Sequence, residues 1–237
     1  MEISFANPEA VICVINTYVE MGVDTLYMKT SEDSVLMSAI DASHTSTMTV
    51  KADARCSGES EVGFPVFSWR KVKGKIKYID KMIIDDEGIL LSVGSIEYRL
   101  PMSAEEYDKE IWTPKKKIDY KYVDVTMSEF IRNYDGIAIL KMPIIFEYDN
   151  GVLKMHSSTS EGISASTDIL TSFFKSKDEK EVHAKTMISY ELIDTFKSLI
   201  KMSDTVKIGI GNNVPIYIEP IIEGMDIKIY IAPRVEQ

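Results

Sequence analysis

Five positively charged side chains lie within ten residues of an otherwise acidic chain. The segment "SWRKVKGKIK", residues 68–77, contains no acidic residue, whereas the whole chain of 237 residues has a formal net charge of −10. Lysine and arginine without base-reading motifs suit contacts to phosphate groups, which are made without regard to nucleotide sequence. The cations of this segment are Arg70, Lys71, Lys73, Lys75 and Lys77.

The spacing around these cations predicts an amphipathic helix over residues 65–77. At 100° per residue its apolar side chains fall on one side and its cations on the other. A helix predicted over residues 189–201 carries Lys197 and Lys201 beside its own apolar stripe. A solvated surface helix is the alternative interpretation. The absence of acidic partners three or four residues away within 68–77, and the lysines in the second helix, favour anion binding.

Two further predicted helices differ in charge. Residues 8–21 begin with Asn7 and Pro8, a typical N-cap followed by proline at the first helical position, and they contain no Lys or Arg. Residues 127–139 offer Arg132 beside acidic residues. We therefore expect the cations to concentrate on the helices predicted over 65–77 and 189–201.

The elements repeat along the chain. The stretches "LYMKTSEDSVLMSA" and "IIFEYDNGVLKMHS" each predict two strands joined by a polar turn, and they lie about 118 residues apart. Each half runs from a helix through this hairpin to a second helix and more strands. The connections are too short for parallel crossovers, so the sequence predicts an α+β fold with antiparallel sheets. The expected domains are residues 1–102 and 120–237, joined by a polar linker over 103–119.

Composition excludes several classes of protein. No apolar run approaches the roughly 18–20 residues that span a bilayer, and the first residues lack the pattern of a signal peptide, so we expect a soluble cytosolic protein. The two cysteines, Cys13 and Cys56, and the three histidines form no clustered metal pattern or disulfide framework. We expect no metal and no cofactor.

Two other functional classes remain as alternatives. An enzyme is the first, but the acidic stretches "IIDDEG" and "YDNG" fit hairpin turns, and no phosphate-binding loop, metalloprotease motif or nucleophile elbow is present. A basic helix that binds a membrane or a partner protein is the second. The lysines at 197 and 201 weigh against it because they place cations in both halves.

Four stretches in order resemble the PCNA family of sliding clamps, over essentially the whole chain. They are "LMSAIDASH" (36–44), "EYRLPM" (97–102), "SDTVKIGIGNNVPIYIE" (203–219) and the ending "IKIYIAPRVEQ". The resemblance implies two topologically similar clamp domains, with helices lining the inner face and antiparallel sheets outside. Three subunits would close into a ring around duplex DNA.

The resemblance also implies a function without catalysis. A clamp tethers DNA polymerase to DNA as a processivity factor, and it binds the clamp loader, flap endonuclease and DNA ligase through short glutamine and aromatic motifs. It binds double-stranded DNA without sequence specificity, and it binds no membrane. A homotrimer is expected, with a heterotrimer or checkpoint-type subunit as the alternative. The location would be the nucleoid of an archaeal cytoplasm or a eukaryotic nucleus.

The resemblance implies three groups of functional residues. The pore would contain a cationic set, namely Arg70, Lys71, Lys73, Lys75, Lys77, Arg132, Lys197 and Lys201. The partner motif would dock on a partner set, namely Ile40, His44, Trp112, Pro215, Tyr230, Ala232 and Pro233. Subunits would join through edge strands at about 94–101 and 162–170. The chain departs from the family in helix 8–21, where Glu9 and Glu20 replace the usual cations.

Overall fold

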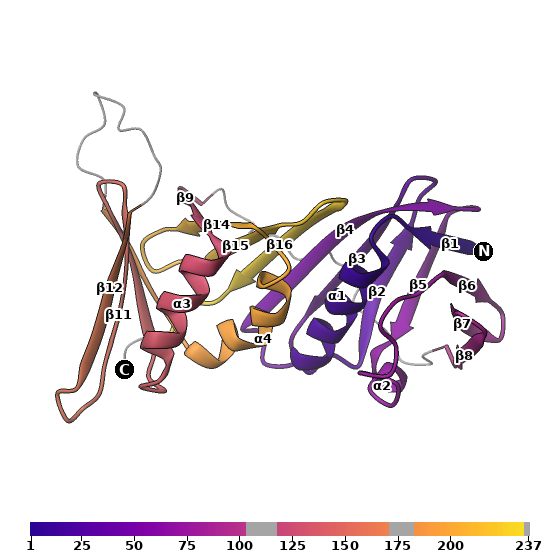
Figure 1. Cartoon of the computed structure of the whole chain (residues 1–237), viewed down its shortest axis with the longest axis horizontal. Helices are drawn as coiled ribbons and strands as arrows, with labels where there is room; N and C mark the ends of the chain where they lie inside the picture. Colours follow the sequence, from indigo (N-terminus) through magenta and orange to yellow (C-terminus); the bar gives the residue numbers. More distant parts are fainter. Residues whose placement is uncertain (103–117, 171–182, 235–237) are drawn as a thin grey trace. The chain divides into compact units, whose positions relative to one another are not determined.

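The computed structural model describes residues 1–102, 118–170 and 183–234. The chain divides into two compact units. The first comprises residues 1–113 with 222–227, and the second comprises residues 114–221 with 228–237. Both units have the same order of elements, which is strand, helix, four strands, helix and three strands (Figure 1). This order confirms the α+β fold with two similar halves.

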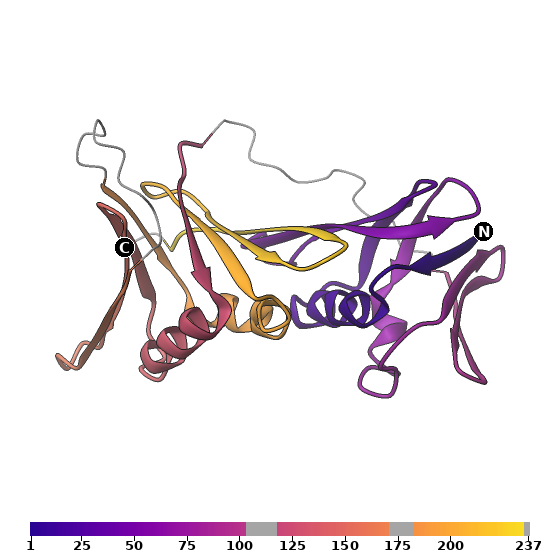
Figure 2. The same cartoon turned by 45° about the horizontal axis from the view of Figure 1, so that its top comes forward.

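The first unit contains two helices. Its elements are β1 Glu2–Phe5, α1 Pro8–Glu20, β2 Thr25–Thr30, β3 Ser34–Ile40, β4 Ser46–Cys56, β5 Ser60–Pro65, α2 Val66–Trp69, β6 Lys81–Asp85, β7 Gly88–Val93 and β8 Ile96–Leu100. The strands pair antiparallel in the order β5-β2-β3-β4-β1-β6-β7-β8. Helix α1 packs against β1 and β4 on one face of this sheet (Figure 2).

The second unit repeats this order of elements, and its second helix is longer than that of the first unit. Its elements are β9 Lys121–Thr126, α3 Met127–Ala138, β10 Ile144–Asp149, β11 Val152–Ser158, β12 Ser164–Leu170, β13 His183–Ile188, α4 Tyr190–Ile200, β14 Thr205–Ile210, β15 Ile216–Ile221 and β16 Met225–Ile231. The strands pair antiparallel in two groups, β12-β11-β10-β13 and β9-β14-β15-β16. Helix α3 packs against strands of both groups.

Local sequence explains where these elements begin and turn. The side chain of Asn7 accepts a hydrogen bond from the backbone N–H of Ala10 at 3.1 Å, as predicted for the N-cap of α1. Thr126 caps α3 in the same way through the N–H of Glu129. In the β10–β11 hairpin, Asn150 and Gly151 have φ values of 50° and 87°, as a tight turn of this kind requires.

The helices predicted over 8–21, 127–139 and 189–201 are confirmed as α1, α3 and α4. The helix predicted over 65–77 is wrong beyond its first turn, because α2 ends at Trp69. Residues 70–75 form successive turns instead, and Gly74 has a φ of +80°. A left-handed residue cannot continue a right-handed helix, so the backbone changes direction before Ile76.

Candidate functional site

The cationic segment of the first unit is anchored by two buried apolar side chains. Trp69 is fully buried, and its indole N–H donates a hydrogen bond to the side-chain oxygen of Asn16 on α1 at 2.9 Å. Ile76 is also buried. The turns between them are held by backbone hydrogen bonds such as Lys73 N–H to the Trp69 carbonyl oxygen. Arg70, Lys71, Lys73 and Lys75 lie on the turns between these two anchors, and Lys77 directly follows Ile76.

Two cations of this segment are paired with acidic residues at the end of α1. Arg70 lies 3.0 Å from the carboxylate of Asp24, and its guanidinium also donates to the carbonyl oxygen of Val23. Lys73 pairs with Glu20, the last residue of α1. Local spacing could not predict these pairs, because the acids lie about 50 residues away along the chain.

The other three cations of the segment are exposed. Lys71 lies over the ring of Phe67, with 5.5 Å between its ammonium nitrogen and the ring centroid. Lys71, Lys75 and Lys77 form no ion pair with any residue that the structure describes. Their ammonium groups are therefore available to an external anion.

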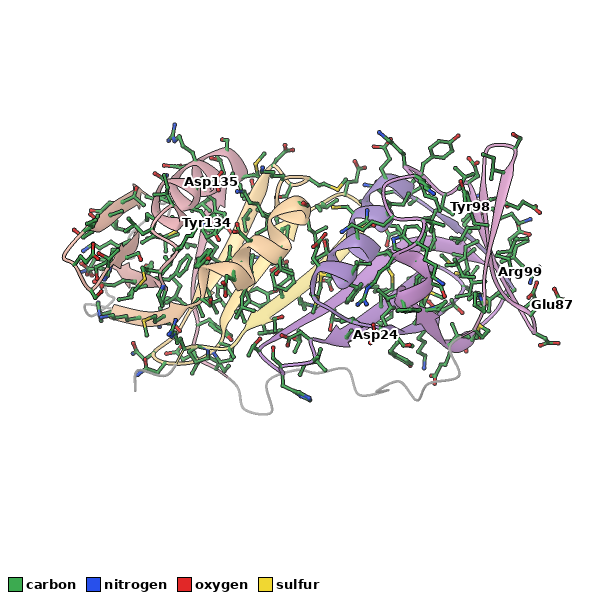
Figure 3. The ribbon with its side chains drawn as sticks, turned by 90° about the horizontal axis from the view of Figure 1, so that it is seen from below. Asp24, Glu87, Tyr98, Arg99, Tyr134 and Asp135 are labelled. Atoms are coloured by element: carbon green, nitrogen blue, oxygen red, sulfur yellow. The ribbon has the colours of Figure 1, made fainter. Side chains whose placement is uncertain are left out.

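In the second unit, the members of the cationic set lie on α3, on α4 and at the C-cap of α4. Lys197 on α4 is 2.5 Å from Asp135 on α3 and 4.0 Å from Asp194, and it lies 5.9 Å from the ring centroid of Tyr134. Figure 3 shows Tyr134 and Asp135 together on α3. The remaining cations, Arg132 and Lys201, are exposed and have no ion pair within residues 1–102, 118–170 and 183–234.

The partner set is divided between the two units. In the first unit, Ile40 ends β3 and His44 occupies the loop that follows, with a φ of 56°. This loop is organised by the buried carboxylate of Asp41. It accepts hydrogen bonds from the backbone N–H groups of Thr45 and Ser46 and from the hydroxyls of Ser43 and Thr45, all between 2.6 and 2.8 Å.

The electrostatics of Asp41 follow from these contacts. Burial acts to raise the pKa of the Asp41 carboxyl, but the hydrogen bonds to its charged form hold that pKa below its usual value. The loop that presents His44 is therefore tied to an ionised aspartate. Sequence reasoning missed Asp41, although the pattern Asp-x-Ser-x-Thr-Ser is typical of a side-chain-stabilised turn.

In the second unit, Pro215 and Tyr230 lie on or beside β15 and β16. The hydroxyl of Tyr120 donates to the carbonyl oxygen of Pro215 at 2.9 Å. Ala232 and Pro233 follow β16 and are half-buried, and the next N–H group, that of Arg234, donates to the carbonyl oxygen of Met187 on β13. The last described residues are thus fixed to a strand edge.

Tyr230 belongs to a group of rings that the sequence reasoning did not identify. The tyrosine cluster consists of Tyr120, Tyr122, Tyr217 and Tyr230, with neighbouring ring centroids 5.2–6.0 Å apart. Tyr122, Gly209, Tyr217 and Tyr230 lie in register across β9, β14, β15 and β16. That cross-strand register, with a glycine between aromatic residues, is the signal that would have found the cluster.

Gly209 makes room for these rings. A Cβ atom at this position would lie 2.9 Å from Cε1 of Tyr122 and 3.1 Å from Cβ of Tyr217. Burial, together with the neighbouring tyrosines, raises the pKa values of Tyr120 and Tyr217 well above the usual value, so both hydroxyls stay protonated. For Tyr217 the nearby carboxylate of Glu219 raises the pKa further. They are hydrogen-bond donors, Tyr120 to Pro215 and Tyr217 to Glu219.

The seventh member of the partner set, Trp112, lies outside the described residues, as does most of the linker predicted over 103–119. The boundaries predicted for the two domains stay predictions.

The predicted subunit contacts fall on two edge strands. Strand β8 ends the sheet of the first unit, and β12 ends the β12-β11-β10-β13 group. Each has an exposed isoleucine at or beside its start, Ile96 with 54% of its surface exposed and Ile163 with 56%. Arg99 on β8 pairs with Asp85 and Glu87, and Figure 3 labels Glu87 and Arg99 near this edge.

Other kinds of site find no support in the described part of the chain. No group of His, Cys, Asp and Glu side chains there has the arrangement to hold a metal ion. None of the described helices combines the length and apolar character needed to cross a membrane. Burial raises the pKa of the Cys13 thiol to about 11, so this side chain is not a thiolate near neutral pH.

Comparison with known proteins identifies the fold. No protein-family model matches the sequence, and no curated protein sequence is significantly similar to it. Solved structures, in contrast, match along the full length. The PCNA2–PCNA3 complex from Sulfolobus tokodaii matches with a TM-score of 0.78 and 19% identity, covering 100% of both chains. At this level of identity the similarity is one of fold.

Two further structures agree with this match. A. fulgidus PCNA, solved with the C-terminal region of FEN-1 bound, has a TM-score of 0.81 and 18% identity, covering 100% of this chain and 99% of that chain. PCNA from Thermococcus kodakaraensis has a TM-score of 0.78 and 16% identity, covering 98% and 99%. The chain therefore has the fold of the PCNA-type sliding clamps, as its sequence resemblance implied.

Proposed function

We propose that this protein is a non-enzymatic sliding clamp, which encircles duplex DNA and holds DNA polymerase on it as a processivity factor. The observation that carries this proposal is the match between 98–100% of this chain and 99–100% of the clamp subunits. A fold alone does not define a function, so the proposal also depends on where the cations and aromatic residues lie.

The cations support contact with DNA phosphates. Lys71, Lys75 and Lys77 in the first unit and Arg132 and Lys201 in the second are exposed and unpaired among the described residues. Lysine and arginine of this kind bind the phosphate backbone without reading bases. The proposed ligand is double-stranded DNA of any sequence.

The partner set supports the binding of short peptides. A. fulgidus PCNA binds the C-terminal region of FEN-1, and the same mode here would use Ile40 and His44 of the first unit with Pro215, Tyr230, Ala232 and Pro233 of the second. Apolar and aromatic anchors of a peptide would meet these side chains. DNA polymerase, flap endonuclease, DNA ligase and the clamp loader are the proposed partners, in an archaeal cytoplasm or a eukaryotic nucleus.

The edge strands support assembly into a ring. Among the described strands, β8 and β12 each have an unpaired edge. Pairing one with the other in the next copy would extend the sheet and cover Ile96 and Ile163. A homotrimer is the simplest such ring. A heterotrimer is the second candidate, because one of the similar structures is a complex of PCNA2 with PCNA3.

Two measurements test the proposal. Light scattering should give about 80 kDa, three times 26.8 kDa, for a self-sufficient ring. A mass near 27 kDa would favour the heterotrimer subunit. The second measurement is retention on DNA after loading by a clamp loader. The protein should stay on a closed circular plasmid and leave when the plasmid is linearised. Equal retention on both forms would contradict encirclement.

A further inference from the structure

The two units share a pairing of acidic and cationic side chains. In the first unit, Glu20 and Asp24, at the end of α1, pair with Lys73 and Arg70. In the second unit, Asp135 on α3 pairs with Lys197 on α4. In both cases the acid comes from the first helix or the residues after it, and the cation comes from the second helix or the turns that extend it. Three of the eight cations of the cationic set are therefore paired within the chain.

These pairs are open to solvent. The side chains of the six residues are between 26% and 59% exposed. Exposed ion pairs are worth little to stability and are screened by salt. An approaching phosphate therefore meets a cation whose carboxylate partner is weakly held but still competes for it.

Such competition reduces the number of contacts that DNA makes. Each phosphate neutralised by a lysine or arginine releases condensed counterions, and the salt dependence of binding counts those contacts. A lysine that stays with its carboxylate releases none. Binding to DNA is then weaker, and depends less on salt, than it would be if all eight cations were free.

We propose that Glu20, Asp24 and Asp135 attenuate the affinity of this protein for DNA by occupying Lys73, Arg70 and Lys197. The inference rests on the proposed function, because it assumes that these cations face duplex DNA. Asp24 and Asp135, which contact Arg70 and Lys197, are labelled in Figure 3. The effect is specific to three carboxylates and does not follow from net charge alone.

The test compares Glu20→Gln and Asp135→Asn with two matched controls. Glu9→Gln lies on α1 and Glu191→Gln on α4, and neither acid has an ion pair among the described residues. Each change removes one negative charge. The affinity of each variant for a 30-base-pair duplex of random sequence is measured by fluorescence anisotropy at several salt concentrations.

We expect Glu20→Gln and Asp135→Asn to bind the duplex several-fold more tightly than the controls at low salt. Each freed cation should also steepen the plot of log affinity against log salt by up to about 0.9. Adding Lys73→Gln to Glu20→Gln should return the slope to that of the wild-type protein. This double variant would identify Lys73 as the cation responsible for the tighter binding and the steeper salt dependence.

The outcomes separate this inference from the proposed function. If the wild-type protein binds the duplex but Glu20→Gln and Asp135→Asn behave like their controls, the attenuation is wrong and the clamp proposal stands. If neither the wild-type protein nor any variant binds the duplex in about 20 mM salt, where phosphate contacts are strongest, the attenuation is overturned. The clamp proposal is then decided separately, by retention on the closed circular plasmid after loading.

Discussion

The second helical segments of the two units occupy the same place in the order of elements, yet they differ in structure and charge. In the first unit α2 is a single turn that continues into irregular turns with four cations, and a fifth, Lys77, follows them. In the second, α4 runs without interruption from Tyr190 to Ile200 and carries one lysine, with another at its C-cap. The comparison shows that one topological position accepts either a regular helix or a dense cationic turn.

The reason for the difference lies in the apolar residues. Helix α4 buries Ile193, Phe196, Leu199 and Ile200, which keep its helical face against the core. The matching segment of the first unit buries Val66, Trp69 and Ile76. Like charges crowd between Trp69 and Ile76, and Gly74 is in the left-handed region. Like charges that are neighbours on a helix destabilise it, and this segment with its many cations is irregular instead of helical.

The strongest test of this comparison separates the free cations of the two units. We expect Lys71→Ala, Lys75→Ala and Lys77→Ala together to lower affinity for duplex DNA on the order of a few hundredfold at about 0.1 M salt, since three phosphate contacts are lost. Arg132→Ala with Lys201→Ala should cost on the order of several tens of fold. Fluorescence anisotropy with one duplex measures both. Equal losses would mean that the cationic turns have no special role.

The partner set extends the comparison to protein partners. Tyr230→Ala removes a ring of the tyrosine cluster and should weaken binding of a glutamine-motif peptide by about 2 kcal/mol or more, as loss of a buried aromatic anchor does. His44→Ala, in the exposed loop of the first unit, should cost less. Isothermal titration calorimetry measures both. Tyr78→Ala, an exposed tyrosine of the first unit, is the control and should bind normally.

The loop that carries His44 should depend on pH through Asp41. Asp41→Asn should lower the free energy of unfolding by about 1–3 kcal/mol at pH 7, because hydrogen bonds to a buried carboxylate are lost. The pKa of Asp41 is lowered in the folded state, so its contribution is full above the unfolded value of about 3.9 and disappears as pH falls through the folded value.

Urea unfolding at pH 7 and at about pH 3 checks this prediction. The difference between the wild-type protein and Asp41→Asn should shrink at the lower pH. A difference that stays constant between the two pH values would contradict a role for the charge.

The smallest expected effects come from a pair of glycines. Gly74→Ala should destabilise the protein by about 1 kcal/mol, because its φ of +80° is unfavourable for alanine. Gly136 lies within α3 with open space around its Cα, so Gly136→Ala should stabilise by about 0.5–1 kcal/mol. Thermal unfolding of the two variants should move in opposite directions. A stabilising Gly74→Ala would mean that the segment is helical in solution.

Much of the fold was predictable because its signals are local. The helix periodicity of α1, α3 and α4, the cap at Asn7 and the hairpin turns are all encoded within a few residues. The segment 65–77 was mispredicted because helical projection assumes a continuous helix, and the positive φ of Gly74 breaks that assumption. A glycine within a cationic segment is the local sign that a predicted helix can end there.

The site was less predictable because it depends on contacts between distant residues. The ion pairs of Lys73 with Glu20 and of Lys197 with Asp135 join elements 53 and 62 residues apart, and spacing within one segment cannot show them. The cluster around Tyr230 likewise depends on the register of four strands. Residue types indicated which ligands the site could bind. Ion pairing between distant elements determines how many of its cations are free to bind them.

The burial of Trp69 has a practical consequence for spectroscopy. The chain has two tryptophans, and replacing Trp112 with phenylalanine leaves Trp69 as the sole indole, inside the core of the first unit. Its fluorescence would then follow that unit, while the near-ultraviolet circular dichroism of the packed tyrosine cluster would follow the second. Coincident or separate transitions of these two signals would reveal whether the units unfold as one cooperative structure or independently.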